Sequence, residues 1–313
     1  MSEESNNMKR VGLAPAAATM ASIFFGASVV ATKYVIDQTT PVQLAFLRYL
    51  IGSLCLTPFL IWPKRVNIPW RDVLPIMGLG IVFFGIFPWT FSAALQHIPA
   101  SRGAVVLATM PLLTLGIASA VGYEKITRTL LFGVALTHLG VAIALGASVQ
   151  TGLSTSWLGY FLMFLTALCG AIFSVFSKPY LKRHPTLHVT ALSILAGTLF
   201  LAPAAIWQIS GTGLPEINES GWMAVVFIGT IGGGIGFFLW IWALERSSPT
   251  RVAVFVTLNP LAATALAALL LSETITVSFT IGLSCVLLGI ILANRRKPVL
   301  TTHSPSNDME NVS

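Results

Sequence analysis

The chain of 313 residues is 55% hydrophobic and only 9% charged, with a formal net charge of +7 and a mean hydropathy of +0.82. Soluble domains carry about 25% charged residues, so this composition excludes a soluble globular protein and indicates an integral membrane protein.

Ten apolar windows follow one another along the chain. Each is long enough to cross the bilayer hydrocarbon at about 1.5 Å of rise per residue. The predicted fold is therefore an all-α integral membrane protein with ten transmembrane helices. Polar tails at 1–10 and 298–313 lack apolar periodicity, and we expect them to be disordered. In chain order the predicted helices are 14–36, 41–62, 72–94, 100–122, 130–147, 157–178, 187–208, 221–243, 250–272 and 278–294.

Basic residues predict the orientation, because Lys and Arg collect in cytoplasmic loops. With the N-terminus inside, 15 of the 18 basic residues fall in cytoplasmic segments, and Lys33, Arg48 and Arg102 are the exceptions. We therefore expect a multi-pass protein of the cytoplasmic (inner) membrane with both termini and both tails cytoplasmic. The positive charge reports this topology and not nucleic-acid binding, since no soluble segment is long enough to present a basic face.

Two segments of the chain share one spacing of Pro and Glu: MPLLTLGIASAVGYEK (110–125) and NPLAATALAALLLSET (259–274). An offset of 149 residues aligns them and also several glycines, while an offset of 145 aligns upstream positions such as Lys33 with Lys178. The shared register predicts two repeats, 11–150 and 151–297. Each holds five predicted helices, an odd number, so the second enters the membrane from the opposite side. Inverted repeats are the plan of many secondary transporters.

Three features resemble the EamA-type branch of the drug/metabolite transporter superfamily. They are FGASVVATK (25–33) on the first helix, Arg48 on the second, and the doubled Pro-to-Glu pattern. The resemblance spans roughly residues 14–295. It implies a small-metabolite carrier with a central cavity lined mainly by helices one, three, four, six, eight and nine. Phe25 stands where many relatives have Trp.

Two basic residues lie inside the first two predicted helices. Lys33 is a candidate gate residue, although its position near the outer end also lets it snorkel to the interface. Arg48 lies about 10 Å in from the outer end of its helix and has Ser193 at the matching repeat position. An Arg inside a membrane needs a partner. We favour a structural clasp to freed carbonyls or to Glu273 over a substrate carboxylate or phosphate.

Aromatic residues crowd matching places on the third and eighth helices, as FFGIFPW (83–89) and FFLWIW (237–242). They can stack on a planar or apolar solute, and the alternative is helix packing and interfacial anchoring. Trp89 and Trp240 are the predicted cavity residues among them. The glycines of GTIGGGIG (229–236) are expected to allow close helix approach.

Two prolines, Pro111 and Pro260, fall near the middles of the fourth and ninth helices. Each removes one backbone N–H and is expected to free the carbonyl four residues earlier, at Leu107 and Val256. Such breaks are tolerated where they line a polar cavity, and the alternative is a plain kink satisfied by a neighbouring Ser or Thr. The predicted lining residues at the breaks are Thr109, Pro111, Asn259 and Pro260.

The paired glutamates, Glu124 and Glu273, each lie 13 residues past a proline, at the inner and outer ends of their helices respectively. The positive N-terminal end of the next helix is expected to attract each carboxylate. Hinge or gate roles are therefore favoured over substrate contact.

Residues able to carry out chemistry are scarce. His138, near the centre of the fifth helix, can relay a proton, but a lone His is more often simply hydrogen-bonded. The three cysteines lack CxxC spacing, and the chain shows neither HExxH nor GxSxG. We expect no catalytic residue, no metal site and no enzyme.

The sequence thus predicts a secondary transporter that moves a small metabolite, an amino acid or similar solute, across the cytoplasmic membrane by alternating access between inverted repeats, with export as the expected direction. A lipid-handling flippase and a non-transporting structural or sensory membrane protein are the alternatives. The expected partners are a small-molecule substrate and the lipid bilayer, with no nucleic acid and no cofactor, and a homodimer is one candidate assembly.

Overall fold

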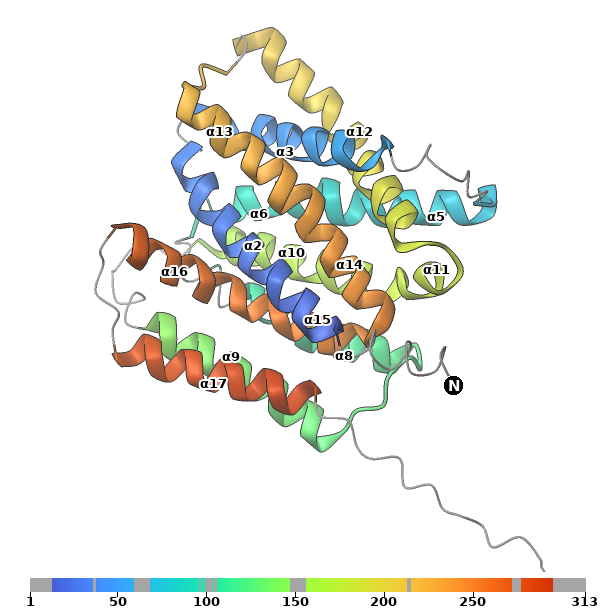
Figure 1. Ribbon diagram of the computed structural model, residues 1–313, viewed down its shortest axis with the longest axis vertical. Coiled ribbons are helices and arrows are strands. Elements are labelled where there is room, and N and C mark those ends of the chain that lie inside the picture. Colours follow the sequence, from blue (N-terminus) through green and yellow to red (C-terminus); the bar gives the residue numbers. More distant parts are fainter. Residues whose placement is uncertain are drawn as a thin grey trace, which may run out of the picture.

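Every element in the described part of the chain is helical (Figure 1). The computed structural model describes residues 13–35, 38–58, 68–95, 97–98, 103, 106–146, 156–212, 215–271 and 277–294. The α-helices are α2 (Ala14–Val35), α3 (Pro41–Leu56), α5 (Trp70–Gly80), α6 (Phe87–Leu95), α8 (Met110–Ala120), α9 (Arg128–Gly146), α10 (Trp157–Phe176), α11 (Lys178–Arg183), α12 (Thr186–Thr212), α13 (Glu219–Phe227), α14 (Phe237–Arg246), α15 (Pro249–Ala253), α16 (Leu258–Leu271) and α17 (Val277–Asn294). Two π-helices, η2 (Ile81–Ile86) and η4 (Ile228–Gly236), and the 3₁₀ helix η5 (Val254–Thr257) complete the set.

Six helical stretches are long and apolar enough to cross a membrane, so the chain is a multi-pass helical membrane protein. Each falls on a predicted window. Three shorter apolar helices fall on the second, fourth and fifth windows, and the ninth falls on α15, η5 and α16. The total of ten spans stays a prediction. The six are Ala14–Thr32, Trp70–Ala94, Trp157–Arg183, Thr186–Gly211, Glu219–Arg246 and Val277–Asn294; the shorter ones are Pro41–Leu56, Met110–Ala120 and Arg128–Ala144.

Two of the long stretches contain a π-helical segment in the middle: η2 between α5 and α6, and η4 between α13 and α14. Such segments are uncommon and frequently occur at functional sites. The predicted close approach at the glycines of η4 is confirmed. A Cβ added to Gly229 would lie 3.2 Å from the carbonyl oxygen of Arg48, and one added to Gly233 would lie 3.1 Å from the same oxygen. The η4 backbone therefore packs directly on α3.

One pair of helix contacts recurs at the offsets found in the sequence. A Cβ on Gly80 would lie 2.4 Å from the Ser193 carbonyl oxygen, and one on Gly229 would lie 3.2 Å from that of Arg48. Positions 80 and 229 differ by 149, and positions 48 and 193 differ by 145. The end of α5 therefore lies on α12 as η4 lies on α3.

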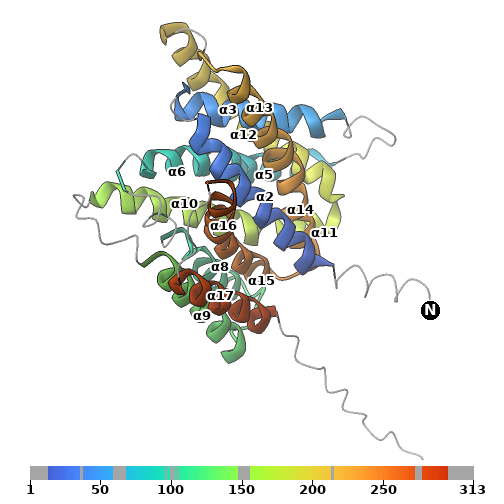
Figure 2. The ribbon, with the colours of Figure 1, turned by 60° about the vertical axis from the view of Figure 1, so that its left-hand side comes forward.

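A second recurring contact joins α9 and α17, which lie side by side in both views (Figures 1 and 2). A Cβ on Gly133 would lie 2.8 Å from the Gly289 carbonyl oxygen, and one on Gly282 would lie 2.5 Å from that of Gly140. The 149-residue offset converts each of these contacts into the other. Glycine lets the two backbones approach this closely.

Candidate functional site

The fourth predicted helix is interrupted before its proline. Residues 108 and 109 form a turn, and α8 begins at Met110 with Pro111 in its first turn. A proline there removes no helical hydrogen bond, so the expected kink within a continuous helix is wrong at this position. Thr109, half-buried, donates its hydroxyl to the Val106 carbonyl at 2.7 Å, and its own N–H bonds to the same oxygen at 2.9 Å.

The ninth predicted helix changes form three residues before Pro260, because η5 separates α15 from α16. The Val256 carbonyl, expected to be free, lies in this 3₁₀ turn and accepts the Leu258 N–H, so that expectation is wrong. Ser22 on α2 donates its hydroxyl to the Phe255 carbonyl at 2.8 Å. The plain-kink alternative expects a bond of this kind, but the carbonyl that Ser22 satisfies is that of Phe255 and not that of Val256. Asn259 is the second residue of α16, directly before Pro260. Its Oδ1 is buried without a hydrogen-bond partner among the described residues.

The aromatic runs of the third and eighth predicted helices meet in the middle of the bundle. We call the residues there the central aromatic cluster. Phe83 stacks on Phe173 with ring centroids 4.5 Å apart, and Phe237 lies 4.8 Å from Phe84. The rings of Phe83, Phe84, Phe173 and Phe237 are buried, which indicates that packing is one of their roles. The members of the cluster are Phe25, Tyr49, Phe83, Phe84, Phe173 and Phe237.

The two predicted cavity tryptophans differ in placement. Trp240 is 1% exposed, its ring centroid lies 6.2 Å from that of Phe25, and its Nε1 is buried without a partner in the described part of the chain. Trp89 is 55% exposed. Trp89 and Trp240 therefore lie in different environments, and the 149-residue offset pairs them with Phe238 and Phe91, not with each other.

Arg48 reaches the edge of the central aromatic cluster from α3. Its Cζ lies 5.5 Å from the centroid of the Tyr49 ring and 5.7 Å from that of Phe237. Its Nε is buried and makes no hydrogen bond to any residue that the structure describes. The predicted partner Glu273 lies outside the described residues, so the structural clasp stays a prediction.

Glu124 contacts the other half of the chain. Gly122, with a φ of 79°, ends α8, and Glu124 Oε1 then accepts the backbone N–H of Thr250 at 2.9 Å. The expectation that Glu124 is drawn to the next helix in the chain is wrong, because its hydrogen-bond partner is in α15. Glu124 Oε2 is buried without a partner in the described ranges.

The remaining predicted charged residues are less informative. His138 Nδ1 lies 2.7 Å from the Val134 carbonyl oxygen, and because that oxygen only accepts, Nδ1 carries the proton. This is the simple hydrogen bond that was weighed against a proton relay. Lys33 lies on α2, and its side chain, like all of Glu273, is outside the described residues.

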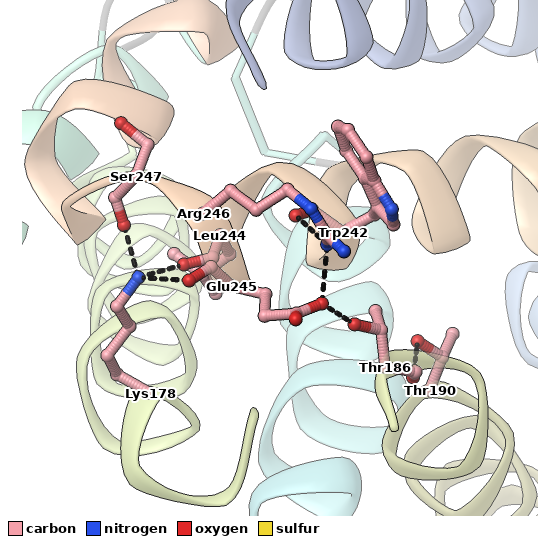
Figure 3. A network of polar contacts seen from close by, with 8 residues as sticks. All are labelled: Lys178, Thr186, Thr190, Trp242, Leu244, Glu245, Arg246 and Ser247. Carbon is pink, nitrogen blue, oxygen red and sulfur yellow. Dashed lines mark hydrogen bonds and ion pairs between the residues drawn. The ribbon is translucent and has the colours of Figure 1, made fainter. Parts of the chain in front are cut away.

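Lys178, at the start of α11, caps the end of α14 (Figure 3). Its ammonium donates to the carbonyl oxygens of Leu244, Glu245 and Ser247, with a distance of 2.8 Å to that of Glu245. A cation at the carboxyl end of a helix satisfies carbonyls that have no helical donor. The Glu245 carboxylate in turn accepts from Arg246 at 2.5 Å and from the Thr186 hydroxyl.

Polar contacts join α5 to the last residue of α11 and the residue that follows it. Asp72 Oδ2 lies 2.6 Å from His184 Nε2, and Oδ1 lies 3.7 Å from Arg183 Nη1. Glu124 and Glu245 both act electrostatically on Lys178, so each lies within electrostatic range of its ammonium. We call Asp72, Glu124, Lys178, His184 and Glu245 the polar end cluster.

Of this cluster the sequence predicts only Glu124 as a site residue, because the other members are ordinary loop charges when considered singly. Lys178 is distinguished in the sequence by its repeat match with Lys33. The available sequence signal is its position two residues after the largely apolar 20-residue helix α10, since a base there either enters solvent or binds helix carbonyls.

Replacing Lys178 by methionine is expected to destabilise the protein by about 2–3 kcal/mol, since three carbonyls lose a charged donor. That corresponds to a fall in Tm of roughly 4–10 °C. Thermal unfolding of the detergent-purified variant measures it. Lys182→Met, an exposed lysine on the same helix, is the matched control and should unfold at the wild-type temperature. Equal melting of both variants would contradict the capping role.

The family model of EamA-like transporters matches this chain at residues 13–146 and 157–295. The chain belongs to the EamA-like transporter family. The two matched segments meet between α9 and α10, and together they cover most of the described helices of this family member.

Similar proteins of this family are named as transporters. An uncharacterized transporter of Archaeoglobus fulgidus is 25% identical over 88% of this chain and 96% of its own length. A probable amino-acid metabolite efflux pump of Salmonella typhimurium is 25% identical over 88% and 92%. A probable terminal-alkyne amino-acid exporter of Streptantibioticus cattleyicolor is 25% identical over 75% and 77%. The general function of this family member is therefore transport.

A solved crystal structure has the same fold as this EamA-like protein. It superimposes with a TM-score of 0.77 at 21% identity, covering 90% of this chain and 96% of that chain. At this identity the likeness concerns the fold alone.

Proposed function

We propose that the protein is a secondary transporter that exports an amino acid or similar small metabolite by alternating access between two inverted repeats, 11–150 and 151–297. The observation that carries the proposal is the pair of α9–α17 contacts that the repeat offset converts into one another. Two halves related in this way can exchange conformations, which turns a cavity open on one side into one open on the other.

The polar end cluster supports this mechanism. Asp72 with His184 and Glu124 with Thr250 are contacts between the two proposed repeats, at sequence separations of 112 and 126. Such contacts close one end of a bundle and must break for that end to open. If both termini are cytoplasmic, as the basic residues favour, the cluster lies at the cytoplasmic end of the helix bundle in the cytoplasmic membrane.

Counterflow in proteoliposomes tests the proposal. Vesicles holding the purified protein and an unlabelled amino acid are expected to accumulate the same labelled amino acid, with saturation and without ATP. Protein-free vesicles are the control. If none of the amino acids, nucleosides, sugars or organic acids tried enters faster than in that control, the proposed function is wrong.

An apolar groove favours a second candidate, a lipid-handling flippase. The groove of about 430 Å³ opens between α2, α13 and α16, where an acyl chain can lie. Transfer of a fluorescent phospholipid between leaflets of the same vesicles separates the two functions. The lining residues are Ala27, Val30, Ala31, Tyr34, Ala224, Phe227 and Leu266.

A further inference from the structure

We propose that Arg48 binds the carboxylate of the transported solute, with the rings of Tyr49 and Phe237 against the solute's apolar part. This inference rests on the proposed transport function and assigns its substrate class: small organic acids and amino acids that carry a free carboxylate.

The position of Arg48 inside a membrane helix demands a partner for its guanidinium. Arg48 is half-buried in a predicted membrane helix, where a charged side chain without a partner is costly. Two aromatic rings, those of Tyr49 and Phe237, lie with their centroids 5.5 and 5.7 Å from its Cζ; they attract the cation but accept no strong hydrogen bond. Its buried Nε is unsatisfied within the described ranges. A bound carboxylate supplies the missing charge and accepts two parallel hydrogen bonds.

The π-helix η4 makes room beside this guanidinium. A Cβ added to Gly232 would lie 3.4 Å from Arg48 Nη2 and 2.1 Å from the Ser28 hydroxyl. Any larger residue at 232 would therefore push against the tip of the arginine or against α2. The glycine therefore leaves no side chain against the Arg48 fork at the point where the helix departs from α-helical form.

A second buried donor lies around the same rings. Phe25 is 4.6 Å from Phe237 and 6.2 Å from Trp240, centroid to centroid, and the Trp240 Nε1–H has no acceptor in the described part of the chain. Unpaired buried donors are few in native proteins and call for an explanation. Two donors facing aromatic surroundings select an anion with an apolar flank.

Thermal stabilisation of the full-length detergent-purified protein tests the assignment without any transport assay. The probes are phenylacetate and L-phenylalanine. Each is compared with the amide in which a neutral carboxamide replaces the carboxylate, phenylacetamide or L-phenylalaninamide. We expect the two carboxylates to raise the Tm in a saturable way and the two amides to need about tenfold or higher concentration.

Variants assign the effect to the residue. Arg48→Gln should lose the carboxylate-dependent shift, and Arg48→Lys should weaken it by about tenfold, because the charge stays but the fork is lost. Gly232→Ala tests the same site without removing the arginine and should also weaken the shift. Arg128→Gln, an exposed arginine at the start of α9, is the matched control and should keep the full shift.

The outcomes are distinguishable. Equal shifts from acids and amides, or a full shift in Arg48→Gln, would overturn the carboxylate site. If the Arg48 variants are unstable before any probe is added, Gly232→Ala decides the question. A full carboxylate-dependent shift in Tm in Gly232→Ala would also count against the site. Carboxylate binding in a protein that shows no counterflow would support the site and overturn the proposed transport function.

Discussion

Replacing Glu124 by alanine is expected to slow counterflow at least about tenfold while the protein remains folded. A hydrogen bond to a charged group contributes about 1.5–3 kcal/mol, and about 1.4 kcal/mol changes an equilibrium constant tenfold. Glu124 bonds the Thr250 N–H across the two proposed repeats, so its loss depletes the state in which this end is closed. Initial rates of labelled amino-acid uptake measure the effect.

The matched control is Glu216→Ala, which removes an exposed acid before α13 and should transport at the wild-type rate. Elution of each variant as one symmetric peak separates slow transport from misfolding. Wild-type counterflow by folded Glu124→Ala would show that this contact does not govern the closed state.

A valine at Gly282 is expected to cause the largest loss of stability. Even a Cβ there would lie 2.5 Å from the Gly140 carbonyl oxygen and 2.6 Å from the Ala144 backbone nitrogen, and backbone atoms cannot rotate away. Overpacking of this kind destabilises by about 1–3 kcal/mol, and the branched valine should lie at the upper end. We expect a fall in Tm of roughly 6–12 °C or a failure to purify.

Gly133→Val should match it, because the repeat offset relates the two positions. Gly116→Val on α8 is the control, since nothing lies within 4 Å of a Cβ at that position. If Gly282→Val melts with the control, α9 and α17 are separated further than the structure indicates.

Much of the fold is predictable because bilayer thickness imposes long apolar stretches on the sequence. The windows at 14–36, 157–178 and 278–294 begin or end within a few residues of α2, α10 and α17. The hydrophobic pattern does not show where a helix changes from α-helical to π-helical or 3₁₀ form. The π turns of η2 and η4 and the 3₁₀ turn of η5 keep the same apolar composition as the α-helices around them.

The candidate site is less predictable, since its partners are distant in the chain. Glu124 was expected to act on the helix that follows it, yet its partner Thr250 is 126 residues away. The three carbonyls bound by Lys178 carry no sequence signal, because every residue has one. Arg48 was recognisable by its charge alone, but its position beside Phe237 required the folded structure.

The reciprocal packing of α9 and α17 also limits where motion occurs. Suppose that each half takes the shape of the other during a transport cycle. The repeat offset converts the Gly133–Gly289 contact into the Gly282–Gly140 contact, and both are already present, so the packing of α9 on α17 is the same before and after the exchange. Contacts such as Gly80 with Ser193 have no such invariance, since they must become like Gly229 with Arg48. The α9–α17 pair then keeps its packing throughout the cycle, and the conformational change occurs in the helices that surround Arg48.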